Sequence, residues 1–460
     1  MKKGWLTKTL GEVLEKTETV NPLQSPNTEF DYIDVSSVSN TTFEIEETQR
    51  LKGKDAPSRA RKQVRTNDII FATIRPTLQR IAVVPEHLDK QVCSTGYFVL
   101  RPKQGIDYRF VFYSLFTENF IGQMESLQKG DSYPAVTDGD VRAQEIPVPP
   151  LAEQQRIVGL LDEAFEGLAT AKTNAEKNLQ NARALFESGL DSAVTGKLTH
   201  KWRRGHLKAE PGSAIIPRIL HERRHRWEQQ RLESYQSKGI APPKDWKKKY
   251  ELPAEVDKRY LPNLPSNWAV VSVSEATHRL TYGITVRPKY VDDGIPIISG
   301  REIRSGEIDL DIANRISQHD YDGLRAKCRL QMNDVLFGKT GTIGSVARVK
   351  TDKPLCVSQN VALLSPLIQP EYFEIVMRSG IIQGMAKEAI INAAIPDLQL
   401  RFLEKFPIPI PPEEEQAVIV KKFHVLREET QRLARIYERK LAALAELKKS
   451  LLHQAFTGEL

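Results

Sequence analysis

Apolar side chains recur at alternating steps of four and three residues in two long stretches, within residues 146–198 and 408–460. This spacing places them along one side of a helix, as in the seam of a coiled coil. Each seam has one polar interruption, Asn178 in the first stretch and Lys440 in the second. The predicted seam residues are Ile157, Leu161, Ala164, Leu168, Ala171, Ala175, Ala182 and Leu185 in the first helix, and Ile419, Phe423, Leu426, Leu433, Tyr437, Leu444, Leu447 and Leu451 in the second.

Proline and glycine mark the ends of both predicted helices. Each begins after a Pro-Pro pair, with Glu153 or Glu415 in its first turn, where a negative charge complements the helix dipole. Each ends before a glycine, Gly196 or Gly458, that can cap the last turn. Such a helix of about 44 residues spans about 65 Å. Alanines in the first seam correspond to large residues in the second, which predicts antiparallel packing of the two helices within one chain. The alternative is that each helix packs only on its own domain.

The chain is an internal duplication. The sequence Ile-Pro-Val-Pro-Pro-Leu-Ala-Glu-Gln-Gln-Arg at 146–156 returns as Ile-Pro-Ile-Pro-Pro-Glu-Glu-Glu-Gln-Ala-Val at 408–418, an offset of 262 that holds to the Thr-Gly-x-Leu endings. Weaker echoes with small gaps precede it: Trp5 matches Trp268, Asn67–Phe71 matches Asn333–Phe337, and Pro134 matches Pro396. A fixed period of this kind indicates two copies of one structural unit.

Short strand-like runs and one helical run fill each globular half, which predicts two mixed α/β domains. The predicted strands lie at 32–35, 68–73, 81–84 and 97–100 in the first half and at 295–299, 334–337 and 361–364 in the second, and the helical runs lie near 108–127 and 371–390. The predicted fold class is therefore α+β. The predicted divisions are a first domain at 1–145, a helix at 146–198, a charged connector at 199–265 with a helix at 218–236, a second domain at 266–407 and a helix at 408–460.

Composition and charge place the chain among ordinary globular proteins. Hydrophobic residues make up 40% and charged residues 27%, and no apolar run approaches the roughly 20 residues of a membrane span. The N-terminus has no apolar core typical of a signal peptide, and Cys93, Cys328 and Cys356 form no CxxC pair. We therefore expect a cytoplasmic protein without a membrane segment. The net charge is +7, and the connector carries sixteen Lys or Arg against eight Asp or Glu.

Motifs that could carry catalysis fail on their context. His221-Glu222-Arg223-Arg224-His225 fits the HExxH pattern of zinc proteases, but three arginines lie beside the proposed dication and no apolar seam buries it. Gly338-Lys339-Thr340 resembles the end of a phosphate-binding loop, yet Asn333 stands where that loop needs glycine. The chain also has no Asn-Pro-Pro-aromatic motif of an adenine methyltransferase and no convincing nuclease carboxylate cluster. The sequence therefore predicts no catalytic residue, no metal site and no cofactor bound by this chain.

Basic patches occupy similar places in both copies. Residues 50–80 hold nine Lys or Arg against two Asp, and residues 325–353 hold seven against two. Positive surface attracts DNA phosphates, and Arg, Lys, amide and hydroxyl side chains read base edges. The candidate DNA contacts are Arg59, Arg61, Lys62, Arg65, Arg75, Thr77, Gln79, Arg80, Lys129, Ser132 and Tyr133 in the first copy, and Arg287, Lys289, Arg301, Arg304, Lys339, Thr340, Thr342, Ser358, Gln359 and Asn360 in the second.

The divergence of the two globular halves, while the helices keep their register, suggests two readers of different sequences on one frame. A duplicated reader of this kind would engage a bipartite site, and because the copies differ the site should be asymmetric. The alternative is a non-catalytic coiled-coil scaffold without sequence-specific DNA binding.

The chain resembles the specificity subunits of type I restriction-modification enzymes. The likeness rests on Ile-Pro-Val-Pro-Pro-Leu-Ala-Glu-Gln-Gln-Arg-Ile-Val at 146–158 with its echo at 408–420, on the Thr-Gly-Lys-Leu and Thr-Gly-Glu-Leu endings, and on Leu-Pro-Ser-Asn-Trp at 264–268. It implies two target recognition domains and two antiparallel helices related by pseudo-twofold symmetry. The long basic connector departs from this pattern.

The resemblance also implies partners and cofactors for a complex on double-stranded DNA. Two modification subunits that methylate adenine with S-adenosylmethionine would bind the helices, and restriction subunits that use ATP and Mg can join them. The residues expected to bind these partners are Glu153, Gln154, Ile157, Glu415, Gln416 and Ile419.

Overall fold

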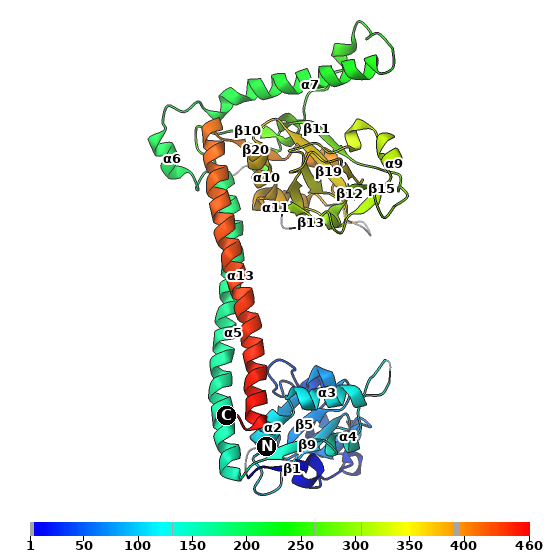
Figure 1. The fold of residues 1–460 in the computed structure, drawn as a ribbon, viewed down its shortest axis with the longest axis vertical. Coiled ribbons are helices and arrows are strands. Elements are labelled where there is room, and N and C mark those ends of the chain that lie inside the picture. The colour runs from blue at the N-terminus through cyan, green and yellow to red at the C-terminus, as the bar shows by residue number, and fades with distance from the viewer. Residues whose placement is uncertain (1–3, 131, 261–262, 305, 391–395) are drawn as a thin grey trace. The chain divides into compact units, whose positions relative to one another are not determined.

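The computed structural model describes residues 4–130, 132–260, 263–304, 306–390 and 396–460 (Figure 1). The chain forms two compact units, one of Met1–Asn178 with Ile436–Leu460 and one of Leu179–Arg435. Each unit holds a globular domain, an end of the long helix α5 (Leu151–Val194) and an end of the long helix α13 (Glu413–Thr457). The two units are described separately below.

The domain of the first unit, here the first domain, runs from β1 to β9. Its three sheets have the strand orders β1-β9, β6-β5-β8 and β3-β2-β7-β4, and β2 and β7 are the parallel neighbours. Its strands are β1 (Leu6–Thr9), β2 (Glu29–Ile33), β3 (Gln49–Lys52), β4 (Ala60–Gln63), β5 (Ile69–Ala72), β6 (Ile81–Val83), β7 (Val92–Ser94), β8 (Tyr97–Leu100) and β9 (Glu145–Val148). Its helices are α1 (Leu10–Val13), α2 (Tyr108–Ser114), α3 (Glu118–Leu127) and α4 (Asp138–Arg142).

The domain of the second unit, here the second domain, runs from β10 to β20. Its sheets have the orders β10-β20, β11-β19-β16-β17, β15-β12-β18 and β13-β14. Its strands are β10 (Ala269–Ser272), β11 (Thr277–Tyr282), β12 (Ile295–Ile298), β13 (Ile303–Arg304), β14 (Glu307–Ile308), β15 (Asn314–Ile316), β16 (Val335–Gly338), β17 (Val346–Arg348), β18 (Cys356–Val357), β19 (Val361–Pro366) and β20 (Pro407–Ile410). Its helices are α8 (Val273–Ala276), α9 (Gln318–Asp322), α10 (Pro370–Arg378), α11 (Gly380–Glu388) and α12 (Leu400–Leu403).

A strand buried on both faces forms the centre of each domain. In β5, Ile69 and Phe71 enter the core under the helices, whereas Ile70 and Ala72 enter a second core against the neighbouring sheet. This division follows from the two-residue period of a strand. The equivalent strand β16 divides in the same way, with Phe337 in one core and Leu336 in the other.

The duplication extends to backbone detail. The pair β1-β9 corresponds to β10-β20, β6-β5-β8 to β17-β16-β19, and the parallel pair β2-β7 to β12-β18. Asn67 and Asn333, just before β5 and β16, both adopt the left-handed conformation, with φ of 69° and 70°. Asparagine tolerates this region better than most residues, which explains why the echo Asn-Asp survives in both copies.

The two long helices pack against each other, as predicted. In the first unit, Ile157 and Leu161 near the start of α5 share a core with Leu452 and Ala455 near the end of α13. In the second unit, the end of α5 shares a core with the start of α13. A start against an end in both units makes the pairing antiparallel. Gly196 and Gly458 follow the helix ends with φ of 76° and 82°, as expected for helix-capping glycines.

The predicted heptad seam is wrong in one respect. Leu185 and Leu447 are 49% and 48% exposed, and the predicted interruptions Asn178 and Lys440 are also exposed. In α5 the buried or half-buried positions instead run from Ala175 through Leu179, Ala182 and Phe186. The half-buried Ala171 precedes this run, so two consecutive steps of four lead from Ala171 to Ala175 and on to Leu179. Such a shift is expected, because an α-helix has 3.6 residues per turn and a strict repeat of 3.5 drifts off the contact face.

The predicted helical runs near 108–127 and 371–390 are each two shorter helices. Thr117 ends the first run by capping α3, where its hydroxyl accepts a hydrogen bond from the Phe120 amide at 3.3 Å. In the second run, Ser379 is extended between α10 and α11. Local side-chain hydrogen bonding of this kind competes with a continuing helix.

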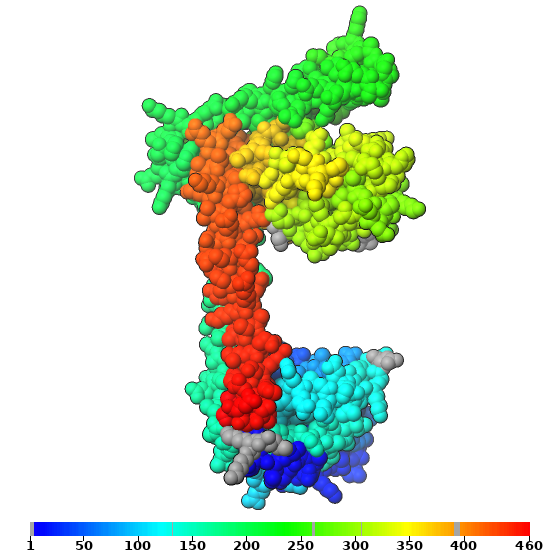
Figure 2. All heavy atoms as spheres, in the orientation of Figure 1, coloured from blue at the N-terminus to red at the C-terminus, as the bar shows by residue number. Residues whose placement is uncertain are grey.

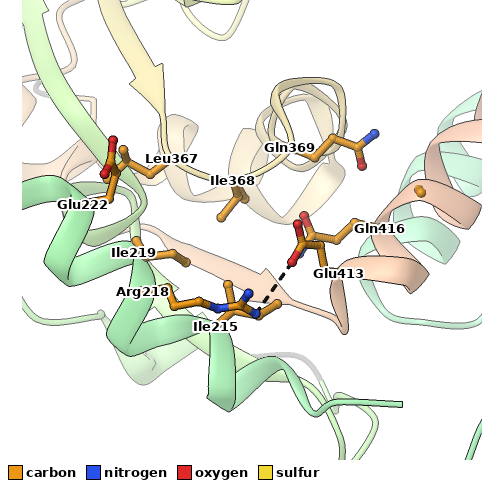
Figure 3. A pocket seen from close by; sticks show the side chains of 10 residues that line it. Ile215, Arg218, Ile219, Glu222, Leu367, Ile368, Gln369, Glu413 and Gln416 are labelled. Carbon is orange, nitrogen blue, oxygen red and sulfur yellow. Dashed lines mark ion pairs between the residues drawn. The ribbon is translucent and has the colours of Figure 1, made fainter.

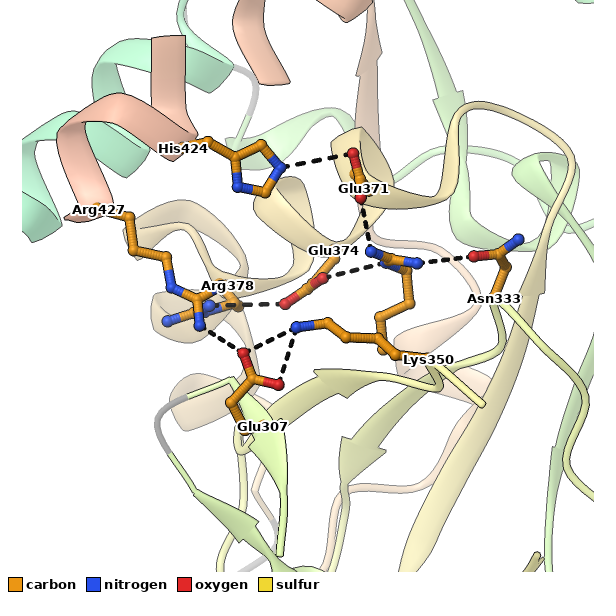
Figure 4. A network of polar contacts seen from close by, with 9 residues as sticks. Glu307, Asn333, Lys350, Glu371, Glu374, Arg378, His424 and Arg427 are labelled. Atoms are coloured by element: carbon orange, nitrogen blue, oxygen red, sulfur yellow. Dashed lines mark hydrogen bonds and ion pairs between the residues drawn. The ribbon is translucent and has the colours of Figure 1, made fainter. Parts of the chain in front are cut away.

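Polar contacts join each domain to its long helix, and the carboxylate lies on the helix in the first unit but on the domain in the second. In the first unit, Arg109 of α2 pairs with Asp162 of α5 at 2.9 Å. In the second unit, Glu371 of α10 lies 3.5 Å from His424 of α13. The offset is 262 at both positions. Figure 4 also shows a second contact between this domain and α13, in which Arg427 of α13 binds Glu307 at 2.5 Å.

The connector packs on the second domain and the start of α13. Its helices are α6 (His200–Gly205) and α7 (Ile216–Gln236), and in Figure 2 the connector, in green, lies against the start of α13, in orange. Arg203 of α6 pairs with the fully buried Glu415. The HExxH segment lies on α7, where Glu222 pairs with Arg226 at 2.6 Å.

Candidate nucleic-acid interface

Three loops of the first domain meet at the ends of β5 and β8. The segment after β5 bonds to the turn before β8, through the Thr73 amide and the Gly96 carbonyl at 2.9 Å. It also bonds to the loop after α3, through the Arg75 amide and the Pro134 carbonyl at 2.7 Å. Arg75 is exposed in a left-handed conformation, with its guanidinium 5.3 Å from the ring centroid of Tyr133. Sequence-distant candidates therefore form one cluster.

Exposed candidates of the first copy can contact a polyanion directly. Tyr133 is 74% exposed, which is unusual for a large aromatic side chain and makes it available for stacking or van der Waals contact with DNA. The candidates that are exposed and near this cluster or on the adjoining surface are Arg59, Arg75, Thr77, Lys129, Ser132 and Tyr133.

Other candidates of the first copy are used within the domain. Lys62 pairs with Asp138 at 2.7 Å and donates to the Tyr97 carbonyl, and only 15% of its side chain is exposed. Arg80 donates to the Val38 carbonyl at 2.6 Å and to two further carbonyls. These internal roles disfavour the predicted DNA contacts. Three more candidates are half-buried or paired: Arg61 donates to the Ala60 carbonyl at 2.8 Å, Arg65 pairs with Glu18 at 2.5 Å, and Gln79 is half-buried.

The equivalent loops of the second domain surround a polar hollow of about 470 Å³. Its lining is Tyr282, Thr285, Lys339, Thr340, Gln359, Asn360, Asp397, Gln399 and Leu400. The loops are joined as in the first domain, since the Lys339 amide donates to the Asn360 carbonyl at 2.9 Å and Thr340 forms a bridge with Asp397. Four predicted residues, Lys339, Thr340, Gln359 and Asn360, therefore lie in one site.

Asp397 is the charged residue of this hollow that the sequence reasoning missed. Lys339 pairs with it at 2.6 Å, and the Thr340 hydroxyl donates to it at 2.5 Å. Burial works to raise the pKa of Asp397, but these two hydrogen bonds outweigh it and lower the pKa. The carboxylate is therefore ionised at neutral pH. The available signal was Pro396, which echoes Pro134 of the first copy and so places Asp397 in the same loop.

The remaining candidates of the second copy lie outside the hollow. Arg287 and Lys289 are exposed, and Arg287 lies 5.6 Å from the ring centroid of Tyr290. Arg301 is exposed but pairs with Glu302 at 2.8 Å, and Arg304 donates to the Arg301 carbonyl. Of the last two, Thr342 is exposed and Ser358 is half-buried.

The predicted partner-binding residues are mainly interior. Glu153 is the partly exposed member and pairs with Arg156 at 2.7 Å. Gln154 accepts a hydrogen bond from the Asp107 amide at 2.9 Å and donates to the Pro149 carbonyl at 2.8 Å, so it holds the first domain to α5. The buried members, with at most 2% exposure, are Gln154, Ile157, Glu415, Gln416 and Ile419.

A second hollow lies between the connector and the start of α13. Figure 3 shows Arg218 of α7 directed toward Glu413, 3.6 Å away, across a space of about 560 Å³. The walls from Ile215, Ile219 and Ile368 are apolar. Among the residues that the structure describes, no group of three or more His, Cys, Asp or Glu is placed to hold a metal ion. In the same part of the chain, no helix is both long and apolar enough to cross a membrane.

Relatives of this chain share its sequence pattern. The type I restriction enzyme EcoBI specificity subunit of Escherichia coli is 26% identical over 318 residues, which are 68% of this chain and 58% of that subunit. The EcoKI specificity subunit of Escherichia coli strain K12 is 23% identical over 383 residues, which are 80% of this chain and 69% of that subunit.

Two solved structures share its fold over the full length. The first is a structure that describes complex assembly and conformational transition of the type I R-M system. It superposes with a TM-score of 0.76 and 24% sequence identity, and the match covers 100% of this chain and 99% of that chain. The other is the HsdS subunit from Thermoanaerobacter tengcongensis, with a TM-score of 0.60 and 24% identity.

A family model covers both copies of the duplication. The model of the type I restriction modification DNA specificity domain matches residues 2–179 and again residues 265–438. Each match includes one globular domain and most of the long helix that follows it. The chain therefore belongs to the family of type I restriction modification DNA specificity domains.

Proposed function

We propose that this chain is the non-catalytic specificity subunit of a type I restriction-modification complex. Each domain reads one half of a bipartite, asymmetric site in double-stranded DNA. The two long helices set the separation of the readers and dock the modification subunits. The alternative hypothesis is a coiled-coil scaffold without sequence-specific DNA binding, and the experiment below distinguishes the two.

The observation that carries the proposal is one loop cluster present twice with different chemistry. In the first domain the cluster presents Arg75, Lys129 and Tyr133, whereas in the second it presents amides together with Asp397. Base edges are distinguished by the donor and acceptor groups that meet them, so unlike clusters on like backbones read unlike sequences. A scaffold has no need for this contrast.

Exposed cations near the clusters supply affinity. Arg59 and Lys129 in the first domain and Arg287 and Lys289 in the second are exposed. Contacts of such side chains with phosphates release counterions, and binding then weakens as salt rises. We assign the phosphate contacts mainly to these residues, since Lys62, Arg80 and Lys339 are engaged within their domains.

Two equivalent leucines are suited to docking two copies of one partner. Leu185 on α5 and Leu447 on α13 differ by the offset of 262 and are about equally exposed. Half-exposed leucines on two equivalent helix positions provide matched apolar contacts for two modification subunits. The earlier candidates Gln154 and Gln416 are buried, so we assign them to holding the domains on the helices.

The remaining parts of the proposal concern cofactors and location. S-adenosylmethionine belongs to the modification subunits, and ATP with Mg belongs to restriction subunits where these join. The complex acts in the cytoplasm, where host DNA is accessible and thiols such as those of Cys93 and Cys356 stay reduced.

The test is methylome sequencing of a host without adenine methylation that expresses the modification subunit with and without this chain. We expect a bipartite adenine-methylated motif that disappears without the chain. Replacing Tyr133 and Lys129 by alanine should change one half of the motif only. The control is Arg224→Ala on the connector, which should leave the motif unchanged. An active modification subunit with the same methylation in the absence of the chain would overturn the proposal in favour of the scaffold.

A further inference from the structure

The polar hollow of the second domain holds its carboxylate in a fixed orientation. Lys339 and Thr340 both donate to the same oxygen of Asp397, Oδ1. From the residues that the structure describes, Oδ2 receives no hydrogen bond, and 37% of the side chain is exposed. One oxygen is thus clamped by two donors, and the other is open to the hollow.

Gly341 follows the two clamping residues Lys339 and Thr340 and carries no side chain. It stands at the position of Arg75 in the first copy, and both residues are left-handed, with φ of 76° and 49°. In the first copy the arginine side chain lies over Tyr133. In the second copy a Cβ on Gly341 would meet nothing within 4 Å. The first copy also has Ala135 at the position of Asp397, so this carboxylate site is confined to the second domain.

An open carboxylate oxygen selects its ligand by charge and by hydrogen-bond polarity. It repels phosphates and base acceptors, and it accepts only from a donor. In the major groove the exocyclic amines of cytosine and adenine are such donors. The N6 amine of adenine lies next to the acceptor N7, which a carboxylate oxygen cannot satisfy. Cytosine presents its N4 amine without a neighbouring acceptor on the same base. Adenine is better matched by an amide, which offers both polarities. Asp397 therefore favours cytosine.

We propose that Asp397 reads the N4 amine of one cytosine in the half-site of the second domain. Lys339 and Thr340 are positioning residues, which act by fixing the carboxylate and keeping it ionised. This inference rests on the proposed function of the chain as a DNA reader. It adds which residue makes a base contact, which base it contacts and in which half-site that base lies.

The test compares the methylation motif of the full chain, co-expressed with its modification subunit, with that of Asp397→Asn. The asparagine keeps the shape but replaces an anionic acceptor by an amide with both polarities. We expect preference for cytosine at one position of the second half-site to fall by about 10- to 100-fold, which corresponds to loss of one base contact. The other positions and the first half-site should not change.

Two further variants separate reading from folding. Glu371→Gln removes a carboxylate of the same domain that pairs with Arg348 at 2.6 Å outside the hollow, and it should leave the motif unchanged. Thr340→Val should weaken the cytosine preference by removing one clamp, and Thr340→Ser should restore it. An Asp397→Asn subunit that methylates the unchanged motif with unchanged preference would overturn the inference while leaving the proposed function intact. Absence of any bipartite motif from the unaltered chain would instead overturn the proposed function.

Discussion

Glu415 and its repeat equivalent Glu153 should differ greatly in their contribution to stability. Glu415 is fully buried at the start of α13. It accepts hydrogen bonds from the Thr199 hydroxyl at 2.6 Å and the Trp268 indole at 3.0 Å, and it also pairs with Arg203. One carboxylate thus joins the connector, the beginning of the second domain and α13. Glu153 is 23% exposed and pairs with a neighbour on its own helix.

The expected magnitudes follow from burial. Replacing Glu415 by glutamine leaves Arg203, which is 15% exposed, without its opposite charge, and removing one partner of a buried pair costs about 3 kcal/mol. For Glu153→Gln the loss of the pair with Arg156, on the surface of one helix, contributes about 0.3–0.5 kcal/mol. In a unit of this size 1 kcal/mol lowers Tm by about 2–4 °C, so Glu415→Gln should lower it by about 6–12 °C.

Differential scanning calorimetry and urea unfolding of the full chain measure both variants against the parent. The two substitutions make the same chemical change at the same position of the repeat, so their difference isolates the environment. Similar losses for the two variants would show that burial and the three donors around Glu415 do not determine its contribution. A Glu415→Gln protein as stable as the parent would refute the reasoning outright.

Three other expectations follow from the structure. Gly167→Ala should stabilise α5 by about 0.5–1 kcal/mol, because a Cβ at this position meets nothing within 4 Å. Gly189→Ala should gain less or lose stability, because its Cβ would lie 2.0 Å from the side chain of Leu426 on α13. Urea unfolding compares the two variants, and equal gains in the free energy of unfolding would contradict the packing. Burial, followed by the charges of nearby arginines, lowers the pKa of His278 from 6.5 to about 4. Between these two pH values the histidine is protonated in the unfolded state but neutral in the folded state, so the unfolded state binds one more proton. Stability should therefore fall over this range as pH is lowered, and His278→Gln should reduce that slope in urea unfolding at pH 5 and 7.5; an unchanged slope would exclude the histidine as its source. Burial raises the pKa of the Cys93 and Cys356 thiols to about 12, so both should resist iodoacetamide at pH 8 until urea unfolds the chain; rapid labelling of the native protein, followed by mass spectrometry, would contradict their burial.

Features encoded by local sequence were predictable. The Pro-Pro pairs and the glycines at 196 and 458 mark helix ends because their backbone restrictions act on their immediate neighbours. The central strands were visible because a doubly buried strand is a short continuous apolar run. The antiparallel helix pair followed from the complementary sizes at equivalent positions. These signals need no knowledge of distant contacts.

Features that depend on distant contacts were not predictable. Asp397 and Lys339 are 58 residues apart, and only the loop arrangement brings them together. Lys62 was expected to face DNA, but its partner Asp138 is 76 residues away. The seam was wrong at Leu185 because a strict heptad and a helix of 3.6 residues per turn agree only over short distances. In each case tertiary structure makes a choice among faces or partners that the local sequence does not carry.

The duplication has kept backbone geometry while changing the polar contacts that use it. Asp68 and Asp334 immediately precede the equivalent strands β5 and β16 and are both nearly fully buried. Asp68 is bound by Arg101, the residue after β8, whereas Asp334 is bound at 2.7 Å by Arg279 of β11, a strand from another part of the repeat.

The domain–helix contacts have likewise exchanged sides, because the carboxylate is Asp162 of the helix opposite Arg109 in the first copy and Glu371 of the domain opposite His424 in the second. A domain moved from one position to the other would therefore meet a different partner on its helix: Glu371 would face the like charge of Asp162, and Arg109 would face His424 in place of a carboxylate. A like-charge contact destabilises such a joint, and so does the loss of a carboxylate partner; exchanging the helix residue restores the pair. The two domains are thus adapted to their own helices, and exchange of a recognition specificity between the two positions is favoured when the helix residue is exchanged with it.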